Sequence, residues 1–171
     1  MKRGRPEIQH TTVEMPVFTG KGENTMFTIE KSIFINRPQQ EVFDYASDPV
    51  NAGKWQSQIL SSEWSSESPH GVGSTQRGVT RFLGRDIESN SEITVWDPPN
   101  QHGFKVVGGP VQVEGGMKFA AEGNGTKVTM SGQIEAGGFF KLAEGLVKKQ
   151  LESQFVTNLE ALKLLLESDS E

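Results

Sequence analysis

The sequence predicts an α+β domain in which a curved antiparallel sheet of about seven strands packs around one long C-terminal helix. Two short helices are expected between the first strand and the second. Two observations predict this class. Apolar residues recur at every third or fourth position over residues 138–167, which is typical of a helix with one apolar face. Upstream of them, short runs that alternate apolar and polar residues are separated by turn signals, which is typical of antiparallel strands.

The C-terminal helix is expected to run from residue 138 to residue 167, a length of roughly 45 Å. A helix with one apolar face needs a large partner surface, and the upstream strands supply it. Its apolar stripe consists of Phe140, Ala143, Val147, Leu151, Phe155, Leu159, Leu162 and Leu166.

Residues 26–167 are expected to form the domain, with a flexible N-terminal tail at residues 1–25 and a frayed C-terminus at residues 168–171. The tail contains Arg3-Gly4-Arg5-Pro6, which is similar to the core of a minor-groove AT-hook. The motif occurs once and is followed by an acidic residue. A basic, flexible leader is therefore the favoured interpretation.

The first strand is predicted over residues 27–36, where apolar and polar residues alternate. Pro38 is then expected to begin a short helix. Proline is tolerated in the first turn because the N–H that it lacks would have no hydrogen-bond partner within the helix. A second short helix begins at Pro49, and Asp48 or Ser47 can cap it.

The remaining strands are bounded by turn signals. Asp-Pro-Pro-Asn at residues 97–100 is one, and residues 122–125 form another, in which Asn124-Gly125 is expected to supply the positive φ of a type I′ hairpin turn. The strands are expected over residues 59–65, 71–82, 86–96, 101–107, 111–120 and 128–134.

Composition excludes several classes of function. The net charge of −5 argues against nucleic acid as a partner, because phosphate-binding surfaces need a basic excess. The chain has no cysteine, which rules out disulfides and thiolate chemistry, and its three histidines lack the spacing of a metal site, so no metal or other cofactor is expected. The sequence shows no long apolar run and no secretory signal. We therefore expect a cytoplasmic protein without integral membrane association.

From Phe27 to about Glu167 the chain resembles the START-like, or SRPBCC, superfamily, and within it the branch described as polyketide cyclase/dehydrase and lipid transport. The resemblance implies a helix-grip fold. Its motifs are turns, caps and core anchors, so they bear on the fold more than on the chemistry. They are Ile33-Phe34-Ile35-Asn36 into Arg37-Pro38, Glu41-Val42-Phe43-Asp44-Tyr45, Ser47-Asp48-Pro49, Asn51, Trp55, Gly71-Val72-Gly73-Ser74, Asp97-Pro98-Pro99, Gly125-Thr126-Lys127-Val128-Thr129 and Asn158-Leu159-Glu160-Ala161-Leu162-Lys163.

The resemblance also implies a cavity between the long helix and the sheet, used in the family to hold small hydrophobic molecules. Small residues at inward sheet positions beside flexible methionines support such a cavity, whereas phenylalanines that fill the same volume would leave a solid core. The residues expected to contact a ligand are Trp55, Arg77, Arg81, Ser89, Ser91, Phe104, Met117, Phe119, Met130, Phe140, Val147 and Leu151.

Three functions stay open. Binding or transport of a small hydrophobic molecule, lipid or polyketide-like, is favoured, because no convergent set of ionisable residues is evident. A cyclase or dehydratase would need an inward acid or base, for which Arg77, Arg81, His102 and Tyr45 are the candidates. The two arginines are expected to point outward instead and to form salt links across the next hairpin. The third alternative, a co-chaperone-like interaction module, would expose an apolar patch.

Overall fold

The computed structural model describes residues 25–82, 84–107, 111–136 and 144–168. The predicted tail, apart from Thr25, lies outside the described residues, as do Phe140 and the last three residues. In chain order the elements are β1 (Thr25–Ile35), α1 (Gln39–Ser47), α2 (Pro49–Trp55), β2 (Ile59–Trp64), β3 (Thr75–Phe82), β4 (Arg85–Asp97), β5 (Gln101–Val107), β6 (Val111–Glu122), β7 (Gly125–Ala136) and α3 (Glu144–Ser168).

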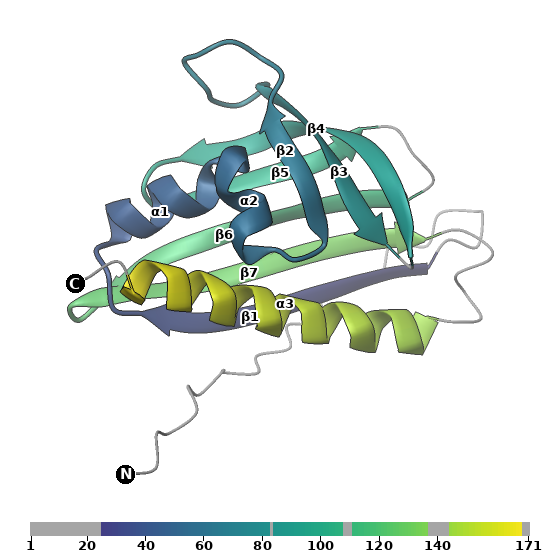
Figure 1. The fold of residues 1–171 in the computed structure, drawn as a ribbon. Coiled ribbons are helices and arrows are strands. Elements are labelled where there is room, and N and C mark those ends of the chain that lie inside the picture. The colour runs from purple at the N-terminus through teal and green to yellow at the C-terminus, as the bar shows by residue number, and fades with distance from the viewer. Residues whose placement is uncertain (1–24, 83, 108–110, 137–143, 169–171) are drawn as a thin grey trace.

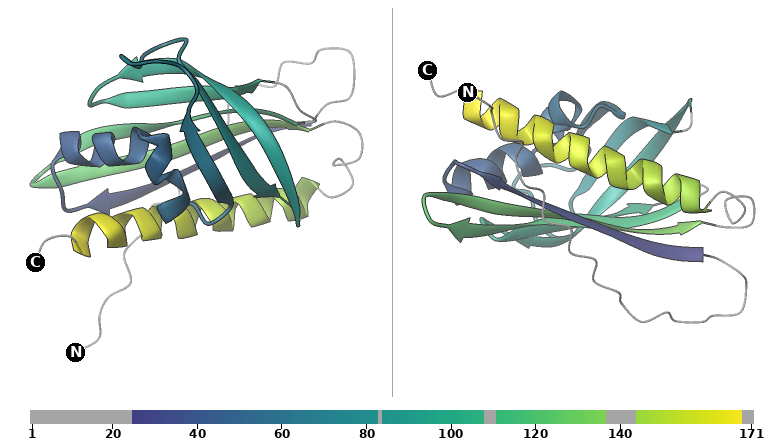
Figure 2. Two further views of the ribbon diagram at one scale, coloured as in Figure 1. Left: turned by 45° about the horizontal axis from the view of Figure 1, so that its top comes forward. Right: turned by 90° about the horizontal axis from the view of Figure 1, so that it is seen from below.

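The seven strands form one antiparallel sheet in the order β1-β7-β6-β5-β4-β3-β2. Neighbouring strands follow one another in the chain, except that β1 pairs with β7. The sheet is strongly curved, α3 lies along β1, and α1 and α2 cover one end (Figures 1 and 2). This arrangement confirms the α+β helix-grip fold.

Both predicted short helices form, although Pro38 directly precedes α1 as its N-cap residue and does not lie in the first turn as expected. Pro49 is the first residue of α2, and the Asp48 side chain accepts a hydrogen bond of 3.1 Å from the Val50 amide. That bond satisfies one of the amides that a helix start leaves without a partner. Between the two candidate caps, the structure therefore selects Asp48.

Two predicted boundaries were wrong by a few residues. Residues 71–74 form a turn and not the start of β3, because Gly73 has a φ of +88° and the Gly71 amide donates to Ser74 Oγ at 2.9 Å. In the β6–β7 hairpin, Gly125 already pairs with Glu122, and it is Gly123 that has a positive φ, of +58°. The turn therefore occupies residues 122–125 as expected, but Gly123 and not Gly125 supplies a positive φ, and β7 begins at Gly125 and not at residue 128.

The pairing register decides which side chains face α3. One inner row crosses the sheet through Ile29, Gly132, Gly115, Phe104 and Ile93, and the ring of Phe155 on α3 lies against Gly132. Residues directly opposite each other point to the same side of a sheet, so this row identifies the inner face of every strand that it crosses.

Buried apolar side chains of the described residues gather in two clusters. The larger lies toward α1 and α2 and includes Phe43, Trp55 and Phe119 with the C-terminal half of α3. The smaller joins the start of β1 and the end of β7 to Val147 near the start of α3, with Leu151 and Phe155 half-buried against it. The predicted stripe of α3 thus divides its contacts between two clusters.

The end of α3 is fastened to the end of β1. Glu167 accepts a hydrogen bond of 2.8 Å from the Asn36 amide and pairs with Lys163 at 2.8 Å. The Lys163 ammonium also donates to the Phe34 carbonyl, and Arg37 Nε donates to the Leu166 carbonyl at 2.6 Å. Hydrogen bonding to the Asn36 amide and to Lys163 outweighs desolvation and holds the pKa of Glu167 below its ordinary value.

Candidate functional site at the inner face of the sheet

Toward β3, β4 and β5 the inner face is only half-buried. Cross-strand pairing places its side chains on the same side as the buried Ile93, yet each keeps some exposed surface. We call this set the inner-face patch: Gln76, Thr80, Phe82, Ile87, Ser89, Ser91, Phe104 and Val106. Its small and apolar side chains form a surface on which an apolar molecule can pack.

Two glycines of the inner row are covered by aromatic rings. A Cβ added at Gly132 would stand 3.0 Å from Phe155 Cζ, and one added at Gly115 would stand 3.2 Å from Phe104 Cζ. Phe104 and Phe155 therefore occupy space that the glycines leave, as the solid-core alternative required. Both rings are half-buried, so they border the inner-face patch and are not sealed inside the core.

The predicted ligand contacts fall into separate groups. Ser89, Ser91 and Phe104 belong to the inner-face patch, while Met130 and Leu151 are half-buried beside the core clusters. The others that face inward are core residues: Trp55, Met117 and Phe119 lie in the larger cluster and Val147 lies in the smaller one. Phe140 is outside the described residues.

Arg77 and Arg81 point away from α3. Arg77 lies opposite Asn90, and Arg81 lies opposite Asp86, which is the outer face of β3 and β4. Arg81 donates to Asp86 at 2.7 Å across the hairpin, as expected, whereas Arg77 pairs with Glu63 on β2 at 2.6 Å. All four side chains are at least half exposed. A molecule held at the inner face would not reach either guanidinium group.

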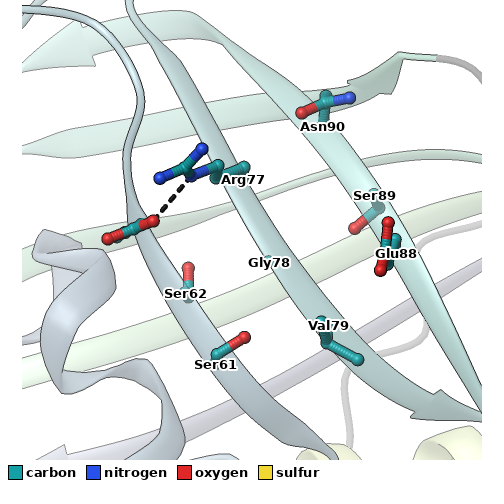
Figure 3. Close-up of a pocket in the computed structure, with 9 residues that line it drawn as sticks. Ser61, Ser62, Arg77, Gly78, Val79, Glu88, Ser89 and Asn90 are labelled. Carbon is teal, nitrogen blue, oxygen red and sulfur yellow. Dashed lines mark hydrogen bonds and ion pairs between the residues drawn. The ribbon is translucent and has the colours of Figure 1, made fainter.

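A shallow depression of about 650 Å³ lies over β2, β3 and β4. Most of its lining side chains share the outer face by register, and Figure 3 shows Arg77, Val79, Glu88 and Asn90 along it. Of the inner-face patch, Ser89 alone is among its lining residues. Its charged groups are solvent-exposed, so a ligand bound there would stay largely in contact with water.

A chain of aromatic contacts leads from the edge of the sheet into the larger cluster. Trp64 stacks on His70 at 3.8 Å and meets the edge of Trp96, which in turn contacts Phe43. His102 packs edge-on against Phe43, with its ring centroid 6.3 Å away. The residue as a whole keeps some exposed surface, but Nε2 is shielded from solvent, and this burial lowers the pKa of His102 to about 4.

Several buried polar atoms find no hydrogen-bond partner among the described residues. They include the indole N–H of Trp55, the side-chain amide N–H group of Asn158 and the amide oxygen of Gln58. Sequence reasoning missed Asn158 as a site residue. The available signal was its position three residues after Phe155 and four before Leu162, which puts a polar residue within the apolar spacing of α3.

Within the described ranges, no three histidine, cysteine or carboxylate side chains lie close enough together to hold a metal ion. Nor does any described helix combine the length and the hydropathy needed to cross a membrane. Tyr45, a candidate acid or base, is half-buried against the larger cluster and lies 5.9 Å beneath the ammonium of Lys54.

Comparison with solved structures finds the same fold in proteins of low sequence identity. The protein TTHA0849 from Thermus thermophilus is 23% identical, with a TM-score of 0.73 over 84% of this chain and 99% of that one. The Zhui aromatase/cyclase from a Streptomyces species is 13% identical, with a TM-score of 0.73 over 86% and 97%. Ara h 8.0201 is 16% identical, with a TM-score of 0.64 over 84% and 99%.

A search of curated proteins found no match. The model of one family, described as polyketide cyclase / dehydrase and lipid transport, matches residues 26–167, which include almost every described residue and leave out the N-terminal segment. The chain therefore belongs to the polyketide cyclase/dehydrase and lipid transport family, as its motifs and helix-grip fold indicate.

Proposed function

We propose that the protein binds a small, largely apolar molecule between α3 and the inner-face patch. The observation that carries this proposal is the patch itself, in which small and apolar side chains facing the helix remain half-buried. Burying such a surface against an apolar ligand gains about 25 cal/mol per Å². The family is described by polyketide cyclisation and lipid transport, so a polyketide-like or lipid-like ligand suits this chain as well.

Binding is better supported than a cyclase reaction. Of the candidate acids and bases, both arginines lie on the outer face, and His102 has a pKa of about 4. General bases work best with a pKa near the operating pH, so His102 would be a weak base at neutral pH.

An interaction module is supported less than binding. The exposed large apolar side chains among the described residues include Val50 on α2, Leu60 on β2, Val72 in the β2–β3 loop and Leu146 and Leu164 near opposite ends of α3. Exposed apolar residues scattered singly over several elements are normal for a protein surface. They do not make the contiguous patch that a docking face would need.

A pair of matched variants on β4 tests the proposed location. Ser89→Phe adds bulk on the inner face, and Asn90→Phe adds the same bulk one residue further on, at an exposed outer position. The probe is prodan, a neutral naphthalene dye whose emission shifts to the blue in apolar surroundings. We expect the wild type and Asn90→Phe to bind prodan alike and Ser89→Phe to bind it at least about tenfold more weakly, an overpacking cost of about 1.4 kcal/mol.

Two results would contradict the proposal. The first is the absence of any prodan binding by the wild-type protein. The second is equal weakening by both phenylalanine variants, which would place the dye outside the inner face. Arg77→Ala serves as a further control, because its exposed ion pair with Glu63 should not contribute to binding at the inner face.

A further inference from the structure

Two buried N–H groups lie in the region where the end of α2 meets α3. The side chain of Trp55 belongs to the larger cluster together with Leu159 of α3, and it is 3% exposed. Asn158, the residue before Leu159, has no exposed surface. Gln154 of α3 links Asn158 to the segment that follows α2. Its amide donates to Asn158 Oδ1 at 2.9 Å and to the hydroxyl of Ser57, two residues after Trp55, at 3.1 Å.

Neither group is satisfied by the protein. Within the described chain, Trp55 Nε1 and Asn158 Nδ2 have no acceptor. A buried donor without a partner typically costs about 1–3 kcal/mol, and native proteins contain few of them. The amide of Asn158 accepts from Gln154 through Oδ1, which leaves Nδ2 as the group without a partner. The indole of Trp55 can only donate in any case.

We propose that Trp55 Nε1 and Asn158 Nδ2 together bind one neutral oxygen, a carbonyl or a hydroxyl, of the apolar ligand. This inference rests on the proposed function and adds the ligand's polar group to it. A hydroxyl bound there would accept from these groups and keep its own proton to donate. A carbonyl would satisfy only the two N–H groups.

The surroundings favour a neutral oxygen over a carboxylate. Trp55 and Asn158 carry no charge, and His102 on the facing strand β5 is unprotonated at neutral pH. Lys31, a buried amine on the inner face of β1, already takes part in an interaction of its own. A carboxylate placed at these N–H groups would have to be desolvated with neither His102 nor Lys31 available to compensate its charge, and that is costly.

The test uses four naphthalenes substituted at the same carbon, which differ only in their polar group. Ethylnaphthalene has no oxygen, acetylnaphthalene has a ketone, naphthyl ethanol has a hydroxyl, and naphthoate has a carboxylate. We expect the full-length protein to bind the ketone or the alcohol about tenfold more tightly than ethylnaphthalene, and naphthoate no better than ethylnaphthalene. The stronger of the two oxygen compounds identifies the group.

Asn158→Leu removes the amide at similar volume, and Thr157→Leu, at an exposed position on the same helical turn, is its control. We expect Asn158→Leu to bind the ketone only as tightly as ethylnaphthalene, while Thr157→Leu keeps the preference. A direct readout that needs no variant at Asn158 is the indole N–H signal of Trp55 in the NMR spectrum, assigned with Trp55→Phe. We expect it to move downfield with the ketone and to stay in place with ethylnaphthalene.

Failure of this inference can be told apart from failure of the proposed function. If all four compounds bind equally and the Trp55 signal stays in place, a hydrophobic site exists but Trp55 and Asn158 do not select an oxygen. A tighter complex with naphthoate would also overturn the inference, because it would require a cationic partner. If none of the compounds binds and prodan does not bind either, the proposed function fails as well.

Discussion

Acidification should destabilise the protein through His102. Burial lowers its pKa from 6.5 to about 4, so between these pH values the unfolded chain binds a proton that the folded protein does not. The stabilising contribution of neutral His102 is complete above pH 6.5 and is lost progressively as the pH falls toward 4. At about 1.4 kcal/mol per pH unit, the loss amounts to about 3 kcal/mol, a large part of the stability of a typical domain.

The matched variant is His102→Phe, which keeps a ring against Phe43 and Phe119 but cannot take up a proton. The assay is urea unfolding of both proteins at a series of pH values. We expect the unfolding free energy of His102→Phe, relative to that of the wild type, to rise by about 3 kcal/mol as the pH falls from 6.5 to 4. Glu167, whose pKa is also lowered, loses its contribution at low pH in both proteins alike, so it cancels in the difference.

Parallel stability curves for the two proteins over this pH range would refute the reasoning. They would mean that water reaches Nε2 of His102 in the folded state and that its pKa is close to ordinary. The NMR titration of the His102 ring gives an independent check, since its proton shifts should stay constant from neutral pH down to about pH 5.

Further expectations concern packing, capping and the fastening of α3. Gly132→Ala should destabilise by about 1–2 kcal/mol in urea unfolding, because its Cβ would stand 3.0 Å from Phe155 Cζ, and Phe155→Leu in the same chain should recover most of the loss. Asp48→Ala should cost about 1 kcal/mol by removing the cap of α2, with an unchanged m-value. Glu167→Gln should cost about 1 kcal/mol at pH 7 and less at acid pH, where the wild-type carboxylate is itself protonated. Hydrogen exchange should be faster for the amides of residues 147–155 than for those of residues 159–166, which pack on the larger cluster.

Much of the fold could be predicted from the sequence, because its elements follow from local patterns. The apolar stripe of α3, the prolines that open α1 and α2 and the period-two strands are all readable within a few residues. The errors have local causes of another kind. The turn at residues 71–74 depends on a hydrogen bond that the Ser74 side chain accepts from the Gly71 amide and on the positive φ of Gly73, which apolar alternation does not reveal.

The candidate site was harder to predict, because it depends on which side of the sheet each residue faces. Around Gly78, both alternating sets of β3 are largely polar, so the sequence does not say whether Arg77 points inward or outward. Only pairing with β4 decides this, since Ser91 and the buried Ile93 fix the inner side. The unpartnered N–H group of Asn158 is harder still to predict, because whether a buried group lacks a partner depends on how the helices pack on the sheet.

The distribution of stabilising contacts is consistent with a ligand site at one end of the sheet. The larger cluster, the aromatic contacts around Phe43 and the hydrogen bonds of Glu167 all lie toward α1, α2 and the C-terminal half of α3. The start of α3 packs on the smaller cluster, whose helix residues Leu151 and Phe155 are only half-buried. Local opening is easiest where buried apolar contacts are fewest. We therefore expect α3 to open first at its start, next to Phe155, while the larger cluster keeps the fold intact.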